Sequence, residues 1–589
     1  MLPHRVTRIY SIFVFLFAVL LLGACILLIT IDYNTFIKWI VVIVQKNGIE
    51  NLLREKALTS QKFKFIQKLC YAAIALLPFL LVLLIKKKEK ILWFISFIWK
   101  SIVFSWKGVF EIYGTAAKQE NLIVLLLLLI IFIKSLHYII AWDLQYDEMW
   151  CYNYFTAQPF YFSFFMYSNY PLYEVITHLF KWLPLPMKIN LRLPVLLTGL
   201  LACFVLYACL KKYFKSHLPA LAGMVLFAFM PVTTFYMLYA RGVIFELFFV
   251  IAGLFSLLFW FRNKHRSAYL VIYILANVLG LYSMPTHVYY WLTLAITGTI
   301  VCFQNESVYI KKFTLCNLLV VLFGFVCYLP IWLASGFSFV TNATAYKSDI
   351  QNAFEYIPGL TAEMAQFFTG FNSGFLFLIL ICVALLFFAK QFRSYRYLLI
   401  ISIVLYLLPT GIYLLQKFDI PERAFAFTSL AIPLTGAVLF KSVETLIKKS
   451  FAYLLIFFLG LFIAIVSDNH SFLNWSRQQD REAIQLSKLF LENNITTCYD
   501  NSVGSGFFYY YPAIEYYYRM NNKTINFTLA ASNSVRYKPL LSSNNYNCIV
   551  YKLHTVDTPR LNRYKEIFRD TAQDFKIMML KQNDKALNK

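Results

Sequence analysis

Long apolar runs recur along this sequence and are its strongest structural constraint, because each is close to the ~20 residues that cross the hydrocarbon core of a bilayer as a helix. Three clear examples are Asn121–Ile140, Leu191–Leu210 and Phe313–Ala334. Hydrophobic residues make up 60% of the chain and charged residues 14%, whereas a soluble domain is about half apolar and about a quarter charged. The pattern predicts an all-α polytopic membrane protein with about thirteen spans.

Basic residues close many of these runs and set the expected orientation. A lysine triplet at 86–88 follows one run, and Lys211 and Lys212 follow another, where the positive-inside rule places the cytoplasmic side. We therefore expect a cytoplasmic N-terminus and an outer C-terminus. These loop residues explain the net charge of +25, so nucleic acid is not expected as a partner. Residues 32–68 carry lysines on the expected outer side, which the rule does not explain.

Residues 1–120 are expected to form an N-terminal extension with two membrane spans and a third helix of another kind. This third segment, Ile91–Phe110, is apolar and aromatic but is interrupted by two lysines. The mixture predicts a helix that lies in the membrane interface. A further membrane span is the alternative interpretation.

A large polar loop, residues 141–190, separates two of the apolar runs. It concentrates Asp143, Asp147, Glu148 and Glu174 among tryptophan, tyrosine and proline residues. Most connections of this kind are short, and carboxylates beside a bilayer are costly unless they face water, a partner or a ligand. The loop is therefore the predicted active site, and it faces away from the cytoplasm.

The tail, residues 467–589, changes from long apolar runs to mixed patterns. A helical spacing over Arg477–Asn493 is followed by strand-like runs at Ile495–Tyr499 and Cys548–Tyr551. Such patterns are typical of a small α/β domain, which the topology places outside the cytoplasm. Two of the eleven cysteines, at 498 and 548, lie in this tail and could pair in an oxidising compartment.

Five short motifs lie near the predicted span ends. They are Asp147-Glu148, Tyr170-Pro171-Leu172-Tyr173, Arg192-Leu193-Pro194, Tyr239-Ala240-Arg241-Gly242 and Pro421-Glu422-Arg423. In combination they resemble motifs of the C-superfamily membrane glycosyltransferases, of the protein O-mannosyltransferase and lipid A aminoarabinose transferase type. The resemblance covers residues 121–466, which we expect to form the glycosyltransferase transmembrane domain. Val195, Val243 and Ala424 depart from the family pattern, so the sugar is left open.

The resemblance implies a GT-C-like fold and transfer, with inversion, of a sugar from a polyprenyl-phosphate donor to an extracytoplasmic acceptor, which is a glycan, a lipid or a protein. A carboxylate can act as general base on the acceptor, and Asp147 is the candidate. A solvated or helix-capping acid is its alternative role. Glu148 is the second candidate catalytic residue and orients the site or a metal.

Cations stabilise the charge of a leaving phosphate, and Arg241 and Arg423 lie at outer span ends where the positive-inside rule disfavours them. Snorkelling to headgroups is the alternative. Six residues are the candidate substrate-binding set: Arg241, Arg423, Asp143, Tyr173, Glu174 and Arg192. Arg192 also suits a structural role that braces the loop against its span. Asp143 lies four residues before Asp147, and the pair leaves room for a divalent cation, although no zinc or redox motif is visible.

Two other functions fit parts of the pattern. A transporter or flippase of lipid-linked sugars would also have many spans, but internal repeats with broken helices at matching places would be expected, and none is visible. A ligase or polymerase of surface polysaccharide would share the lipid-linked donor. The expected location is a bacterial inner membrane, with the active site on the extracytoplasmic side and membrane lipid as a further partner.

Overall fold

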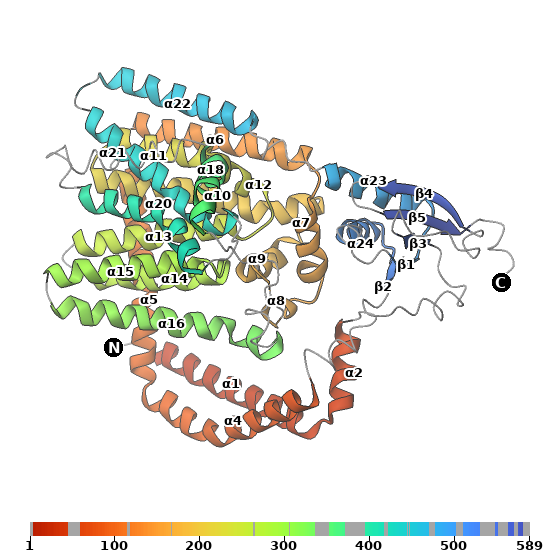
Figure 1. The fold of residues 1–589 in the computed structure, drawn as a ribbon. Helices are drawn as coiled ribbons and strands as arrows, with labels where there is room; N and C mark the ends of the chain where they lie inside the picture. The colour runs from red at the N-terminus through yellow and green to blue at the C-terminus, as the bar shows by residue number, and fades with distance from the viewer. Residues whose placement is uncertain are drawn as a thin grey trace. The chain divides into compact units, whose positions relative to one another are not determined.

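The computed structural model describes residues 4–44, 59–114, 118–165, 168–262, 266–305, 307–335, 353–370, 395–416, 422–444, 446, 448–469, 478–501, 510–529, 548–551, 564–570 and 575–580. The chain divides into two compact units (Figure 1). The first contains Met1–Ile139 and Pro159–Phe472, and the second contains Ile140–Gln158 and Leu473–Lys589. We call them the membrane unit and the tail unit.

The membrane unit begins with four long helices. They are α1 (His4–Thr30), α2 (Tyr33–Val44), α4 (Ser60–Lys86) and α5 (Lys88–Gly114). Helices α1 and α4 pack together, and Phe63 of α4 is buried against Tyr33 and Phe36 of α2. Helix α5 also contacts two later helices of the unit, α10 and α14.

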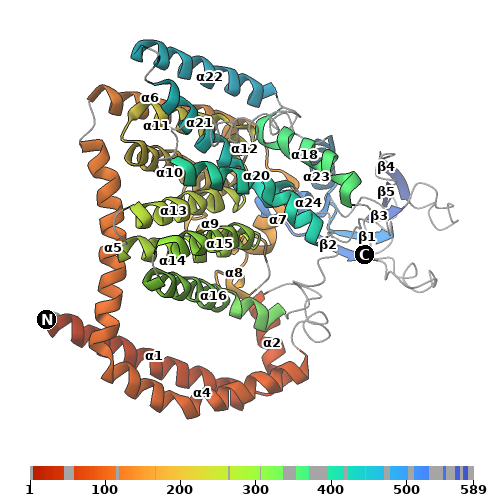
Figure 2. The same ribbon diagram turned by 60° about the vertical axis from the view of Figure 1, so that its left-hand side comes forward.

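The remaining helices of the membrane unit form its helical core. They are α6 (Lys118–Ala141), α8 (Phe162–Phe165), α9 (Pro171–Phe180), α10 (Met187–Phe214), α11 (His217–Phe229), α12 (Pro231–Leu238), α13 (Val243–Arg262), α14 (Ser267–Ser283), α15 (His287–Asn305), α16 (Ser307–Ser335), α18 (Ala353–Thr369), α20 (Arg396–Gln416), the 3₁₀ segment η5 (Glu422–Leu430), α21 (Ala431–Val443) and α22 (Lys449–Asn469). Helix α13 packs against α10 and α14, and α11 packs against α10 and α21. Helix α5 runs across the direction that α13, α14 and α15 share (Figures 1 and 2).

Eight helices among the described residues are long and apolar enough to cross a membrane. They are Tyr10–Thr30, Phe63–Lys86, Lys118–Ala141, Met187–Phe214, Val243–Arg262, Tyr309–Trp332, Glu422–Ser442 and Lys449–Ser467. Helices α11 and α12 form one more span if the pair, bent by 60°, is counted as one. Three shorter apolar helices are Ser267–Ser283, His287–Phe303 and Tyr397–Ile412. The chain is therefore an integral membrane protein whose spans are α-helical, whereas the expected count of about thirteen spans is not confirmed.

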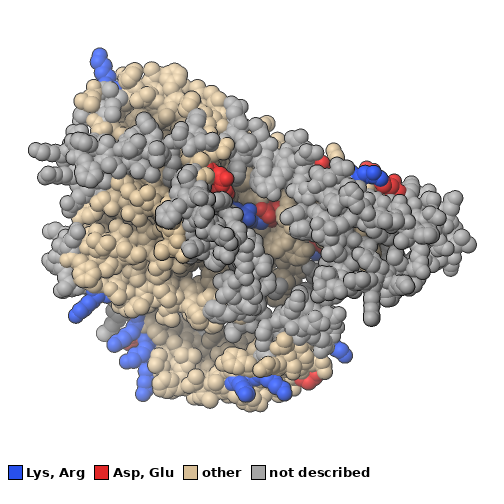
Figure 3. Space-filling view, in the orientation of Figure 1, with Lys and Arg blue, Asp and Glu red and all other residues tan. Residues whose placement is uncertain are grey.

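The outer surface of the membrane unit has the chemistry that lipid requires. Large apolar side chains such as Phe79, Leu318 and Phe457 are exposed on α4, α16 and α22. On the face shown in Figure 3, most described side chains are neutral, and basic ones gather along its lower left margin. A surface of this kind loses little by facing hydrocarbon, since unpaired charges are what a bilayer core excludes.

The tail unit has a five-stranded mixed sheet in the order β2-β1-β3-β5-β4. Its elements are α7 (Tyr146–Cys151), the π-helical turn η2 (Tyr152–Thr156), α23 (Gln478–Glu492), β1 (Thr497–Asn501), α24 (Tyr511–Met520), β2 (Asn526–Leu529), β3 (Cys548–Tyr551), β4 (Tyr564–Asp570) and β5 (Phe575–Leu580). Strand β1 is parallel to β2 and β3, whereas β5 is antiparallel to β3 and β4. The predicted helix and both predicted strands are confirmed, so the tail contains a small α/β domain.

Cys498 and Cys548 occupy directly paired positions on the neighbouring strands β1 and β3. Both are buried, and their sulfur atoms lie 3.6 Å apart as free thiols. The strand register brings the two cysteines together, and their pairing in an oxidising compartment stays a prediction.

Several sequence predictions lie outside the described residues. They are a span expected over Gly374–Ala389, residues 336–352 of an outer loop expected over Ser335–Phe371, Pro421 of the last motif and the start of the helix predicted at Arg477. Glu422 and Arg423, the other two residues of that motif, are described.

Candidate active site

Arg241 lies in the tight turn that joins α12 to α13. Its backbone N–H donates to the carbonyl oxygen of Tyr239 at 2.6 Å. The side chain is 8% exposed, and its Nη1 donates to the hydroxyl of Tyr170 at 3.3 Å. The guanidinium carbon lies 5.0 Å from the ring centre of Tyr170 and 5.8 Å from that of Tyr239. The electron-rich ring faces stabilise a cation there.

Gly242 is required by the close packing around this turn. A Cβ at this position would lie 2.8 Å from the carbonyl oxygen of Ser283 and 2.9 Å from Cδ1 of Tyr170. Only a residue without a side chain lets α13 begin so close to Tyr170 and to the end of α14. The motif glycine therefore fixes where the guanidinium of Arg241 is presented.

The motif around Tyr170 forms the start of α9. Pro171 is the first residue of this helix, a position where proline lacks only a hydrogen bond that the helix does not make. The N–H of Tyr170 donates to Oγ of Ser168 at 3.0 Å. The Ser168 hydroxyl in turn lies 3.4 Å from Oε1 of Glu174, which is fully buried. Glu174 thus belongs to the network that shapes the backbone at Tyr170.

Two other candidate binding residues bond to backbone carbonyl groups. Tyr173 is fully buried, and its hydroxyl donates to the carbonyl of Leu191 on α10 at 3.1 Å. Arg192 is 2% exposed, and its Nη1 lies 3.5 Å from the carbonyl oxygen of Ile139 on α6. Both contacts join helices of the membrane unit, α9 to α10 for Tyr173 and α10 to α6 for Arg192.

Arg423 is the second residue of η5, which packs against α13. The side chain of Arg423 is partly exposed, and η5 continues into buried aromatic contacts, with the ring centres of Phe425 and Tyr289 6.1 Å apart. The two candidate phosphate-binding arginines therefore belong to the same unit. Arg241 lies two residues before α13, and Arg423 lies on η5, which contacts that helix.

A buried acid on α13 was not identified from the sequence. Glu246 is fully buried, and neither of its carboxylate oxygens has a hydrogen-bond partner among the described residues. Oε1 lies 3.7 Å from Nδ1 of His287, whose Nε2 lies 3.3 Å from Oδ1 of Asn277. An acid within an apolar run is itself evidence of a special position, and that signal was present in the sequence.

Asp147 and Glu148 lie in the first turn of α7 in the tail unit. Oε2 of Glu148 accepts a hydrogen bond from the backbone N–H of Gln145 at 2.8 Å, and the side chain is fully buried. Glu148 therefore caps the helix end, in the manner of the acidic residue of a capping box. Asp147 is partly exposed. The two adjacent acids thus lie in different surroundings.

The segment after α7 packs against α24 of the tail unit. Nδ2 of Asn153, which is fully buried, donates to the carbonyl of Pro512 at 2.7 Å. The rings of Tyr152 and Tyr516 meet edge to face with centres 5.4 Å apart. Burial and the negative charge of Asp143 raise the pKa of Tyr517 to about 12. The acidic segment of the predicted loop is therefore held by residues more than three hundred positions later.

The candidate residues divide between the two units. Asp143, Asp147 and Glu148 belong to the tail unit, and Tyr173, Glu174, Arg192, Arg241 and Arg423 belong to the membrane unit. Within the described ranges, no group of three or more histidine, cysteine, aspartate or glutamate side chains could hold a metal ion. A divalent cation stays a prediction.

No protein-family model matches the sequence, and no curated protein matches it in sequence. The structure is similar to that of ArnT from Cupriavidus metallidurans bound to undecaprenyl phosphate, with 12% identity and a TM-score of 0.51 over 79% of this chain and 98% of ArnT. The apo state of the same protein matches with 11% identity and a TM-score of 0.52 over the same shares. The Archaeoglobus fulgidus oligosaccharyltransferase in complex with zinc and sulfate matches with 12% identity and a TM-score of 0.44, over 67% of this chain and 61% of that one.

The two ArnT matches show that this chain has the GT-C fold of membrane glycosyltransferases. The family resemblance drawn from the sequence motifs is thereby confirmed at the level of the fold. The predicted fold class, an all-α membrane protein with a small α/β tail domain, is confirmed as well.

Proposed function

We propose that this protein transfers a sugar from a polyprenyl-phosphate donor to an extracytoplasmic glycan, lipid or protein, with inversion at the sugar. The observation that carries the proposal is Arg241, a buried arginine between two tyrosine rings at the start of α13. A guanidinium can bind phosphate oxygens in a bidentate way. The GT-C fold and the undecaprenyl phosphate bound to ArnT support the choice of donor.

In the proposed reaction, Asp147 accepts the proton of the acceptor hydroxyl or amine. The acceptor atom then attacks the anomeric carbon, and the bond between that carbon and the phosphate oxygen breaks. The electron pair leaves with the polyprenyl phosphate, whose charge Arg241 and Arg423 stabilise. The partial exposure of Asp147 suits a base, whereas the hydrogen bond that Glu148 accepts from Gln145 suits a residue that positions α7.

A reconstituted assay tests this function. The purified protein is placed in liposomes with a panel of undecaprenyl-phosphate-linked hexoses and pentoses and an envelope fraction as acceptor, and released undecaprenyl phosphate is measured by mass spectrometry. Acceptor-dependent release from one donor is the expected result. A transporter of lipid-linked sugars would move the donor across the bilayer without releasing the free lipid phosphate, and that outcome would overturn the proposal.

The role of the arginines is tested with Arg241→Lys and Arg423→Lys, which keep the charge but lose the bidentate geometry. We expect kcat/KM for the donor to fall by about 10- to 100-fold, the effect of losing a charged hydrogen bond worth ~1.5–3 kcal/mol. Arg569→Lys is the matched control, because Arg569 is exposed on β4 and pairs with Glu566. Parental donor dependence in both site variants would refute the phosphate role.

A further inference from the structure

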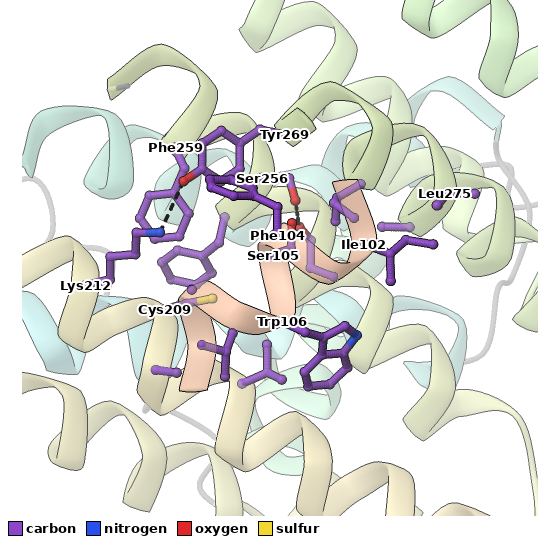
Figure 4. A pocket seen from close by; sticks show the side chains of 18 of the residues that line it. Ile102, Phe104, Ser105, Trp106, Cys209, Lys212, Ser256, Phe259, Tyr269 and Leu275 are labelled. Carbon is purple, nitrogen blue, oxygen red and sulfur yellow. Dashed lines mark hydrogen bonds between the residues drawn. The ribbon is translucent and has the colours of Figure 1, made fainter. Parts of the chain in front are cut away.

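An apolar cavity of about 270 Å³ lies between α5 and the helical core of the membrane unit. Its walls come from α5, α10, α13 and α14 (Figure 4). Aliphatic and aromatic side chains dominate the lining, for example Ile102, Val109, Val205, Phe248, Phe255 and Leu279. A slot with walls of this kind suits a hydrocarbon chain, and its volume is below the ~300 Å³ at which sites for whole drug-sized ligands begin.

Lys212 brings a positive charge to this apolar cavity. Its Nζ donates to the hydroxyl of Tyr269 at 3.1 Å and lies 4.8 Å from the ring centre of Phe259 (Figure 4). A Cβ on Gly108 of α5 would lie 3.5 Å from the same Nζ. No carboxylate of the described residues pairs with Lys212, whereas the adjacent Lys211 pairs with Glu120 at 3.0 Å. The charge of Lys212 is therefore available to an anion.

A second cation lies beside the α5 wall. The guanidinium carbon of Arg266 is 4.1 Å from the ring centre of Phe104, a residue of the cavity lining. Arg266 is exposed, and no acidic partner for it occurs in the described part of the chain. Ser105 of α5 also lines the cavity, and its buried hydroxyl has no hydrogen-bond partner among the described residues. The cavity thus combines an apolar slot, two cations and one unused donor.

This cavity is distinct from the candidate active site. Arg241 precedes the first residue of α13, whereas Lys212 contacts Phe259 near the end of that helix. A helix of 20 residues is about 30 Å long, so the cation of the cavity lies near the other membrane surface. That surface is the one at which basic residues close the spans, which the positive-inside rule assigns to the cytoplasm.

We propose that the cavity binds one anionic glycerophospholipid of that leaflet. An acyl chain fills the apolar slot, and the phosphate lies at Lys212 and Arg266. An ester carbonyl at the head of the chain accepts the hydrogen bond that the Ser105 hydroxyl does not otherwise make. Anionic lipids of the cytoplasmic leaflet attract basic residues that lie near that membrane surface. The lipid joins α5 to the core, and the proposal does not depend on the glycosyltransferase function.

Native mass spectrometry of the delipidated full-length protein tests the proposal. Dioleoyl-phosphatidylglycerol and the zwitterionic dioleoyl-phosphatidylcholine are added separately. The parent protein should retain one phosphatidylglycerol and little phosphatidylcholine. Ala252→Phe fills the slot from α13 and should weaken retention roughly tenfold or more, because each buried methylene contributes to lipid binding. Lys212→Gln should weaken retention about fivefold, and Lys211→Gln, the matched control, should leave it unchanged.

Several results would overturn the proposal. Equal retention of both lipids would remove the role of the cations, and undiminished retention by Ala252→Phe would place the lipid elsewhere. Preferential retention of undecaprenyl phosphate, lost in Ala252→Phe, would make the cavity a donor site instead. Should Ala252→Phe fail to fold, a cryo-electron microscopy map of the parent in phosphatidylglycerol nanodiscs decides. Chain-like density in the cavity would support the proposal, and an empty cavity would refute it.

Discussion

Asn153 should control how firmly the acidic loop segment is held in the tail unit. Its side chain is fully buried, Nδ2 donates to the carbonyl of Pro512 at 2.7 Å, and its own backbone carbonyl accepts from Nε2 of Gln158 at 2.7 Å. The Asn153→Ala change removes the first of these bonds and keeps the second. Pro512 is the second residue of α24, so the lost bond is a direct polar link between η2 and that helix.

The cost follows from the bond that the change removes. The Pro512 carbonyl lies in the first turn of α24 and keeps an intrahelical acceptor role, so the change loses one hydrogen bond, which contributes about 0.5–1.5 kcal/mol. If the segment opens locally, this lowers its opening free energy by the same amount, and the opening equilibrium shifts by roughly 2- to 10-fold. Asn521→Ala is the matched control, because Nδ2 of Asn521 donates to the carbonyl of Tyr517 at 2.8 Å on an exposed surface at the other end of the same helix.

Hydrogen exchange of the full-length protein, followed by mass spectrometry, is the assay. Peptides that contain α7, η2 and α24 should exchange roughly 2- to 10-fold faster in Asn153→Ala, whereas Asn521→Ala should resemble the parent. Exchange that is unchanged in both α7 and α24 would refute the reasoning that residues 140–158 belong to the same compact unit as the tail.

Two further changes probe the membrane unit. Gly242→Ala should lower the unfolding free energy by about 1–3 kcal/mol, because its Cβ would meet Ser283 and Tyr170 at under 3 Å; thermal unfolding in detergent measures this, and an unchanged transition would contradict the packing argument. Tyr173→Phe should cost about 1 kcal/mol through the lost bond to Leu191 and leave the donor KM as in the parent, whereas a raised donor KM with unchanged stability would assign Tyr173 to the binding site.

The sequence was sufficient for features that depend on local patterns. Runs of apolar residues identified most of the membrane helices, and alternating patterns near Cys498 and Cys548 identified β1 and β3. The GT-C fold was predicted from short motifs, which can be recognised from their own residues and their order along the chain. These features are local because helix and strand periodicity are properties of a single segment.

Long-range contacts could not be predicted in this way. Nothing in the residues near Asn153 indicates that its partner is Pro512, because the contact joins segments 359 positions apart. The bend between α11 and α12 was missed because Pro231 lies inside a continuous apolar stretch, which predicts a single span. Glu246 was missed as well, because the apolar residues around it indicated an ordinary membrane span. Its burial beside His287 depends on tertiary packing, which the sequence does not show.

The most direct test of the proposed mechanism is the turnover of Asp147→Asn in the reconstituted assay with the donor that the parent uses. Loss of a positioned general base costs about 10²–10⁴-fold in rate, so turnover should fall by that factor while thermal unfolding and membrane insertion match the parent. Asp32→Asn is the control, because Asp32 accepts hydrogen bonds from the N–H groups of Asn34 and Thr35 and asparagine caps a helix equally well. A near-parental rate for Asp147→Asn would contradict the assignment of Asp147 as the base.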